Sequence, residues 1–307
     1  MAEEIKSDWP IFRKEFSSWS MFIDHAANAK TDMPMEDRES RHQKAAGSYE
    51  SFTKAKSWDH VLELARDGWP EGLKKAKEVS SVLFNHVSEM IEKLNVSYDI
   101  EGHSIDIARF VDGEPESWLK FESVLQEAEA GHKLIKITYN VTVSAGVSTD
   151  VIIRKGATVA ALIELLEYAG HRVELTIVDS SGNSRLEPSH GFVRKDLKPI
   201  MLFFVKIKEF DQNLDMNLVS YALSHPSVAR ALMFSAMETA PENIRKLAGV
   251  HKYGFYGTPT DIALEDRGDI HIPHSHFDDV QWATTESAET WVKQKLQEQG
   301  VHLKKEN

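Results

Sequence analysis

The densest group of side chains that could bind a metal lies in a short segment near the C-terminus. His271, His274 and His276 occur within six residues, and Asp278 and Asp279 follow them. Imidazole and carboxylate groups are ligands that zinc, nickel and ferrous iron use in proteins. The chain has 14 histidines, however, and this spacing is not tied to one face of a helix. We therefore expect a solvated loop, keep the three histidines as weak metal candidates and predict no cofactor.

Polar side chains also follow an apolar run that ends near residue 143. Asn140, Thr142 and Ser144 lie at its carboxyl end, where open α/β sheets bind ligands. This strand, its loop and the next helix resemble the von Willebrand factor A fold, whose metal site uses an Asp-x-Ser-x-Ser motif. Asn140 stands where that motif has its aspartate, so the charge that holds a divalent cation is missing. The resemblance implies a non-enzymatic protein-interaction module with a degenerate sheet.

Positive charge is concentrated in one stretch of an acidic chain. Residues 185–208 carry six basic and two acidic side chains, so this stretch is +4 and the rest of the −12 chain is −16. Cations that follow a phosphate backbone, with an aromatic ring that stacks on a base, suit single-stranded nucleic acid. A solvated loop is the alternative interpretation. The residues predicted to bind nucleic acid are Arg154, Lys155, Arg185, Phe192, Arg194, Lys195 and Lys198.

Composition and missing motifs exclude several classes of protein. The chain has no cysteine, which removes thiol nucleophiles, disulfides and cysteine-ligated metals. It contains no phosphate-binding loop, no dinucleotide-binding glycine motif and no serine nucleophile elbow. No apolar run is long enough to span a membrane, and the acidic N-terminus does not resemble a secretory signal. We therefore expect a cytoplasmic protein that is not an enzyme and has no membrane partner.

Periodicity predicts helices in the first part of the chain and alternating strands and helices in the second. Apolar residues with helical spacing follow Ser57, a good N-cap, and Pro70, which opens a second helix. Gly68 is expected to end the first of these helices. The helices predicted here are Glu15–Lys30, Trp58–Ala65, Pro70–Leu94 and Glu116–Ala130.

The second part reads as an α/β unit. We expect strands at 134–143, 172–178 and 200–208, with a helix at 156–168 between the first two. Strand–helix–strand order at this spacing predicts a mostly parallel, three-layer sheet and no OB fold. Two helices should follow, broken at His225 and Pro226, then a short strand within 251–256, a loop at 258–285 and a terminal helix at 287–299. The predicted domains are a helical region, 1–130, packed beside an α/β domain, 131–307.

Four segments of the chain are similar to a family of uncharacterised proteins encoded by tailed bacteriophages. They are Trp58–Gly72, Gly113–Trp118, Gly156–Glu174 and Leu214–Arg230. In general character the chain also resembles the single-stranded-DNA-binding cofactor of an RNA polymerase in phages that carry a virion RNA polymerase, a protein with a fold unlike the OB barrel. That resemblance implies an accessory factor in the cytoplasm of an infected cell, with single-stranded DNA and phage RNA polymerase or replication proteins as partners. Whether it forms a homo-oligomer stays open.

Overall fold

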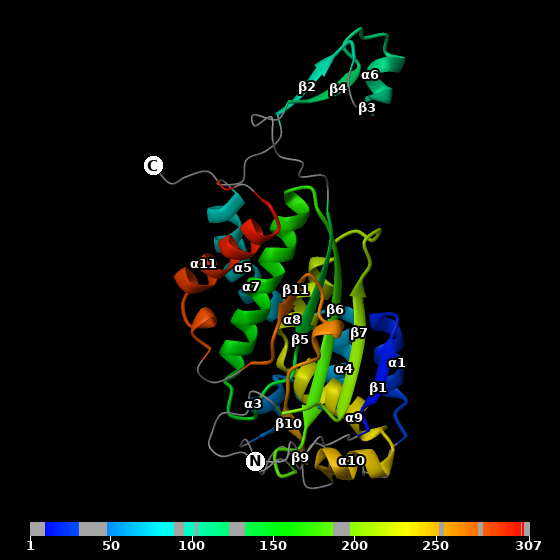
Figure 1. The fold of residues 1–307 in the computed structure, drawn as a ribbon, viewed down its shortest axis with the longest axis vertical. Coiled ribbons are helices and arrows are strands. Elements are labelled where there is room, and N and C mark those ends of the chain that lie inside the picture. The colour runs from blue at the N-terminus through cyan, green and yellow to red at the C-terminus, as the bar shows by residue number, and fades with distance from the viewer. Residues whose placement is uncertain are drawn as a thin grey trace, which may run out of the picture.

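The computed structural model describes most of the chain. The described residues are 10–30, 48–88, 95–101, 104–122, 133–186, 197–251, 255–275, 279–301 and 303. Phe192, Arg194, Lys195 and His276 therefore lie outside the described residues. The described part forms an α/β body and a small β lobe (Figure 1).

The body is built on one mixed, mostly parallel sheet. The strands lie in the order β1-β7-β6-β5-β11, and β10 pairs with the end of β6. Strands β5 and β6 are parallel and joined through helix α7, as predicted, whereas β7 runs antiparallel to β6 and parallel to β1. The α/β fold class is confirmed. The strand bounds are β1 Phe12–Phe16, β5 Leu134–Asn140, β6 Arg172–Gly182, β7 Met201–Lys208, β10 Thr258–Pro259 and β11 Ile270–Ile272.

Helices cover one face of this sheet and share a continuous apolar core with it. Alternate strand residues such as Ile137, Ile177 and Phe203 belong to the same buried cluster as residues of α1, α4, α7, α8 and α9. Near-continuous burial along α7 shows that this helix lies at the centre of the body. The helices of the body are α1 Trp19–Ala27, α3 Tyr49–Thr53, α4 Trp58–Asp67, α5 Pro70–Ser88, α7 Thr149–Tyr168, α8 Met216–Ser224, the π-helix η1 Val228–Leu232, α9 Met233–Glu238, α10 Glu242–Ala248 and α11 Thr285–Glu298.

The opposite face of the sheet differs from the expected three layers. Val178, Leu202 and Phe204 form a separate small cluster with Ile262. Ile262 belongs to the segment between β10 and β11, which includes the short 3-10 helix η2 (Leu264–Asp266). Among the described residues, this segment rather than an α-helix packs on these side chains, because the β6–β7 pair is antiparallel and needs no crossover helix.

The N-terminal region belongs to the same body, so the predicted boundary at residue 130 does not separate two cores. The helix expected at 15–30 is present as α1 but begins later, after the N-cap Ser18, because Glu15 and Phe16 belong to strand β1. One apolar cluster contains residues from Phe16 to Val301. The indole Nε1 of Trp19 donates a hydrogen bond to the carbonyl of Ala65 at 2.9 Å, which ties α1 to α4.

Several elements agree with the sequence prediction. Ser57 caps α4 by accepting a hydrogen bond from the amide of His60, Gly68 ends that helix, and Pro70 opens α5. The break at His225 and the C-terminal helix are also confirmed. The predicted strand within 251–256 is a short hairpin of β8 (Val250–His251) and β9 (Phe255–Tyr256), whereas the segment expected to be loop contains β10, β11, η2 and the 3-10 helix η3 (Val280–Trp282).

The small lobe has its own three-stranded antiparallel sheet. It comprises β2 (Asn95–Asp99), β3 (Ser104–Ile105), the short helix α6 (Ile107–Val111) and β4 (Trp118–Glu122), and Figure 1 draws it at one end of the molecule. Strand β4 replaces the first part of the helix predicted from Glu116 onward, since its pairing with two strands overrides local helix preference. In the described part of the chain, no helix is both long and apolar enough to cross a membrane.

Candidate functional site

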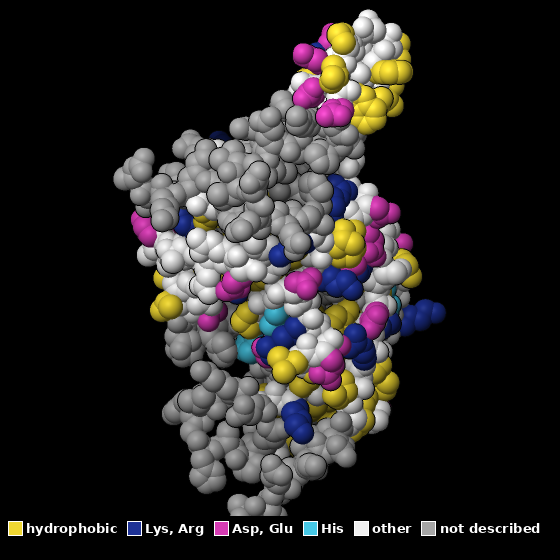
Figure 2. Space-filling view, turned by 45° about the horizontal axis from the view of Figure 1, so that its top comes forward, with side chains coloured by type: hydrophobic (Ala, Val, Ile, Leu, Met, Phe, Trp, Pro, Cys, Tyr) yellow, Lys and Arg dark blue, Asp and Glu magenta, His cyan; other side chains and the backbone are white. Residues whose placement is uncertain are grey.

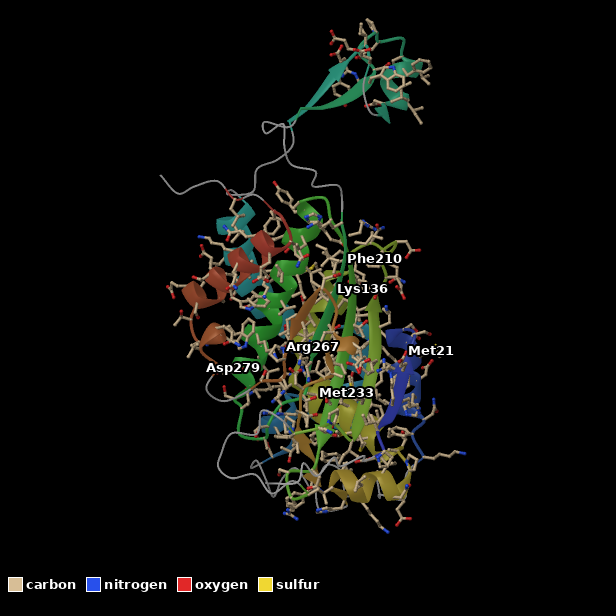
Figure 3. The ribbon with its side chains drawn as sticks, in the orientation of Figure 1. Met21, Lys136, Phe210, Met233, Arg267 and Asp279 are labelled. Atoms are coloured by element: carbon tan, nitrogen blue, oxygen red, sulfur yellow. The ribbon has the colours of Figure 1, made fainter. Side chains whose placement is uncertain are left out.

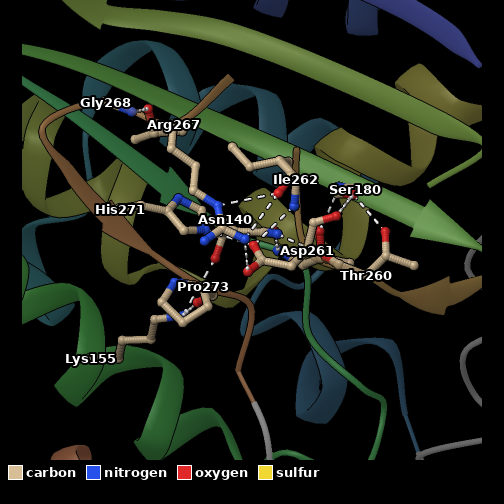
Figure 4. A network of polar contacts seen from close by, with 12 residues as sticks. Asn140, Lys155, Ser180, Thr260, Asp261, Ile262, Arg267, Gly268, His271 and Pro273 are labelled. Atoms are coloured by element: carbon tan, nitrogen blue, oxygen red, sulfur yellow. Dashed lines mark hydrogen bonds and ion pairs between the residues drawn. The ribbon is translucent and has the colours of Figure 1, made fainter. Parts of the chain in front are cut away.

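The candidate site lies at the carboxyl ends of β5 and β6, the edge that includes Asn140 and Thr142. Four segments meet there: the end of β5, the first turns of α7, the segment after β10 and the segment after β11. Val143 forms an isolated bridge with Ser275, which closes the loop after β11 onto the loop after β5. Figure 4 shows the polar network that results.

Asn140 and Thr142 are buried and bonded to other protein groups. The amide of Asn140 donates to the carbonyl of Thr260 at 3.0 Å, and its oxygen accepts from the backbone of Thr142 at 3.0 Å. The hydroxyl of Thr142 donates to Asp179 at 3.3 Å and accepts from the amide of Ser180 at 2.8 Å. The side chains of Asn140 and Thr142, which the von Willebrand factor A resemblance would assign to a metal, are therefore bonded to protein groups. Ser144, the third residue of that motif, is exposed.

Asp179 is an acid that the sequence gave no reason to single out. It lies on β6, is 1% exposed, and its burial raises its pKa to about 7, opposed by the hydrogen bond from Thr142. A carboxyl with this pKa titrates at neutral pH. An aspartate inside a strand next to apolar residues was the only available signal.

Lys155 supplies positive charge to the same edge. Its side chain runs from α7 past the ring of Tyr139, and Nζ donates to the carbonyl of Pro273 at 2.5 Å, the hydroxyl of Ser275 at 3.0 Å and the carbonyl of Asn140 at 3.4 Å. Three oxygens therefore receive the three protons that an ammonium carries. Burial lowers the pKa of Lys155 to about 7, and the carboxylates of Asp279 and Asp261 oppose that shift.

A second ion-pair group lies beside this one. Asp261 accepts a hydrogen bond from Nε2 of His271 at 2.6 Å and from the guanidinium of Arg267 at 2.8 Å. Burial alone would raise the pKa of Asp261, but the hydrogen bond and charge of His271 and the charge of Arg267 hold it below its usual value. In the view of Figure 3, Arg267 lies between Lys136 and Asp279.

The metal prediction gains no support from the described residues. His271 belongs to β11, and its Nε2 is hydrogen-bonded to the carboxylate of Asp261. Within the described ranges, no three histidine, aspartate or glutamate side chains are grouped so as to hold a metal ion. His276 lies outside those ranges.

Two of the residues predicted to bind nucleic acid are placed elsewhere. Lys155 is only 1% exposed, so its ammonium cannot follow a phosphate backbone, and this prediction is wrong. Arg154 is half-buried, and its guanidinium donates to the carbonyls of Trp282 and Ala283, where it fastens η3 to α7. Arg185 and Lys198 are exposed. They stand on either side of residues 187–196, a segment that is not described and that contains the other three candidates.

Ion pairs also reduce the charge available from the basic stretch. Lys206 pairs with Glu174 at 2.8 Å, and the buried Lys208 pairs with Glu167 at 2.6 Å. Both lysines therefore stabilise the body of the protein rather than offering a free cation. The basic character that remains lies between Arg185 and Lys198.

A cleft of about 380 Å³ opens at the other end of the sheet, beside the carboxyl ends of β1 and β7. Its polar rim includes Ser18 and Asp215, whose side chains cap α1 and α8. Lys206 and Glu209 on the same rim pair with each other at 3.6 Å. These groups cap the two helices and pair at the end of β7.

Comparison with known proteins gives the chain a family. A family model described as a domain of unknown function, DUF7192, matches residues 3–302. The chain belongs to the DUF7192 family. The match runs across residue 130. No curated protein and no solved structure matches the DUF7192 chain.

Proposed function

We propose that this DUF7192 protein is a non-enzymatic protein-interaction module. A lysine amine lies at the sheet edge where the sequence resemblance to a von Willebrand factor A domain would place a metal. The observation that carries the proposal is the contact set of Lys155: Nζ binds three oxygens at the carboxyl edge, beside the buried Asn140 and Thr142. Below its pKa of about 7, the protonated amine of Lys155 holds the loops together without recruiting an ion from solution.

The surrounding contacts favour a scaffold over a catalyst. Asp179 accepts a hydrogen bond from the hydroxyl of Thr142. Asp261 is hydrogen-bonded to His271 and Arg267. A catalytic acid or base must reach a substrate atom, and these groups instead reach one another. The edge therefore fixes the shape of the loops around it, which is the requirement for presenting a surface to a partner protein.

The test is recovery of the full-length, tagged protein from cells that carry its gene, after cross-linking. Parallel samples contain EDTA, Mg²⁺ or nuclease. We expect one protein partner in constant proportion to the tagged chain in all three samples. If the partner is recovered only in the presence of Mg²⁺, the result would favour a functional metal site instead. Absence of any constant partner would overturn the proposal.

Binding of single-stranded DNA is a second candidate, favoured by one observation. Arg185 and Lys198 are exposed at the two ends of a segment whose sequence adds Phe192, Arg194 and Lys195. Cations with a stacking ring suit single strands, and an acidic body would limit binding to duplexes. In that case the protein would serve as an accessory factor to phage transcription or replication, the role that its resemblance implies.

Fluorescence anisotropy with labelled single and double strands separates the two candidates. The DNA hypothesis predicts salt-sensitive binding to single strands that is weakened by the double substitution Arg185→Glu and Lys198→Glu. The exposed Lys246→Glu serves as a control, because Lys246 lies on α10 and pairs with Glu242 at 2.6 Å. Undetectable affinity for single strands at low salt would remove this candidate and leave the interaction module.

A further inference from the structure

The described side chains of the small lobe are mostly exposed or partly exposed. Among its side chains that the structure describes, only that of Ser117 is buried. Three strands usually need a packed apolar face or a covering helix before they are stable alone. This lobe has one helix of five residues, and several of its described apolar side chains lie at the surface.

Those apolar side chains are concentrated on and beside α6. Ile107 is 72% exposed, Phe110 is 59% exposed and Val111 is 75% exposed. Their spacing of three and four residues places them on one face of the helix. Ile100 and Tyr98 add further apolar surface from the end of β2. Exposed apolar side chains gathered on one helix face in this way are typical of an interaction site.

Acidic side chains outnumber basic ones among the described residues of the lobe. The lobe's described acidic side chains are Asp99, Glu101, Asp106, Asp112, Glu114 and Glu116. Its described basic side chain, Arg109, pairs with Glu114 and lies 4.0 Å from the ring centroid of Tyr98, so its charge is already compensated. Figure 2 shows hydrophobic and acidic side chains side by side on this lobe.

We propose that the lobe is a docking surface for a basic, amphipathic helical segment of a partner protein. This rests on the proposed function and names the surface and the chemistry of the partner. An apolar stripe on the partner would cover Ile107, Phe110 and Val111, and its lysines or arginines would face the acidic rim. A symmetric contact with a second copy brings two acidic lobes together and is disfavoured by their like charge.

The probe is a fluorescein-labelled peptide of about 18 leucine, alanine and lysine residues, with its leucines on one helical face. Anisotropy measures its binding to the full-length protein, with two comparison peptides: one with glutamate for lysine and one with the same composition in scrambled order. The lobe variant is Ile107→Asp with Val111→Asp. The matched control is Leu264→Asp with Val280→Asp, residues that are 77% and 74% exposed on the body.

We expect the basic amphipathic peptide to bind, and the lobe variant to bind it at least about tenfold more weakly than the control variant does. The acidic and scrambled peptides should bind the wild-type protein no better than the basic amphipathic peptide binds the lobe variant. Added salt should weaken the complex of the basic peptide with the wild-type protein. Circular dichroism verifies folding of each variant. If the lobe variant fails to fold, Asp112→Lys with Glu116→Lys replaces it, because this pair reverses the charge of the rim at two exposed positions.

Equal binding to wild type and folded lobe variants, or equal binding of the acidic peptide, would overturn the docking proposal. Concentration-dependent self-association that the lobe variant abolishes would also overturn it, in favour of a second copy. If the peptide fails while the cross-linking experiment still recovers a constant partner, only the lobe assignment falls. If both experiments fail, the proposed function falls with it.

Discussion

Replacing Lys155 with methionine should change how the stability of the protein depends on pH. In the folded state burial lowers the pKa of Lys155 from 10.5 to about 7, whereas the unfolded chain keeps the ordinary value. The unfolded state therefore binds more protons than the folded state between these two values. The free energy of unfolding of the wild type must rise with pH across this window, and below pH 7 this group adds no slope.

The magnitude follows from the size of the shift. At 1.36 kcal/mol per pKa unit, integration from pH 7 to pH 10 gives a gain of roughly 3 kcal/mol for the wild type relative to Lys155→Met. The assay is urea unfolding monitored by tryptophan fluorescence at one-unit pH intervals, with Lys246→Met as a control on an exposed lysine whose side chain is 73% accessible. Groups that titrate identically in both proteins cancel in the difference.

Two outcomes would refute this reasoning. The difference between wild type and Lys155→Met could stay constant from pH 7 to pH 10, or the wild type could lose stability relative to the variant. Either result would mean that the three oxygen acceptors outweigh burial and hold Lys155 protonated. If the variant does not fold, the ¹⁵N chemical shift of the Lys155 amine in the wild type gives the same pKa directly.

Three further predictions concern the body of the protein. Because burial raises the pKa of Asp179 to about 7, the wild type should lose stability between pH 4 and pH 7 relative to Asp179→Asn, and a flat difference in urea unfolding would contradict this. Gly156→Ala should lower the free energy of unfolding by about 1–3 kcal/mol, since its Cβ would lie 2.3 Å from the carbonyl oxygen of Leu223. Gly146→Ala, with no atom within 4 Å of the added Cβ, should stay within about 0.5 kcal/mol of wild type, and equal losses would refute the packing argument. Trp19→Phe should cost about 1–2 kcal/mol in thermal unfolding because it leaves the buried carbonyl of Ala65 without its donor; an unchanged melting temperature would contradict that contact.

The central elements were predictable because their signals are long or strongly marked. Strands β5, β6 and β7 carry runs of branched and aromatic residues, and α4 has an N-cap, an apolar stripe and a terminal glycine. Strands β1 and β11 were missed because five and three residues are too few to show a period. The continuous apolar run of β7 correctly indicated burial on both faces, but a central antiparallel strand meets that condition as well as a parallel one does.

The sequence drew attention to this edge of the sheet, but it could not show which contacts the side chains make there. Arg154 and Lys155 looked like neighbouring surface cations, yet successive residues on a helix point about 100° apart, so one faces the sheet while the other reaches η3. Two of the three partners of Lys155 come from a segment more than 100 residues away, a pairing that local sequence does not reveal. Ile107, Phe110 and Val111 likewise resemble core residues in the sequence, and only their exposure distinguishes them.

Hydrogen-exchange mass spectrometry of the full-length protein, free and bound to the partner recovered by cross-linking, tests the central claim most directly. An interaction module that docks through its lobe predicts slower exchange within residues 95–122 and unchanged exchange at 140–144 and 271–275, with EDTA or Mg²⁺ present. Slower exchange confined to the sheet edge, or confined to residues 185–198 and produced equally by single-stranded DNA alone, would contradict the account.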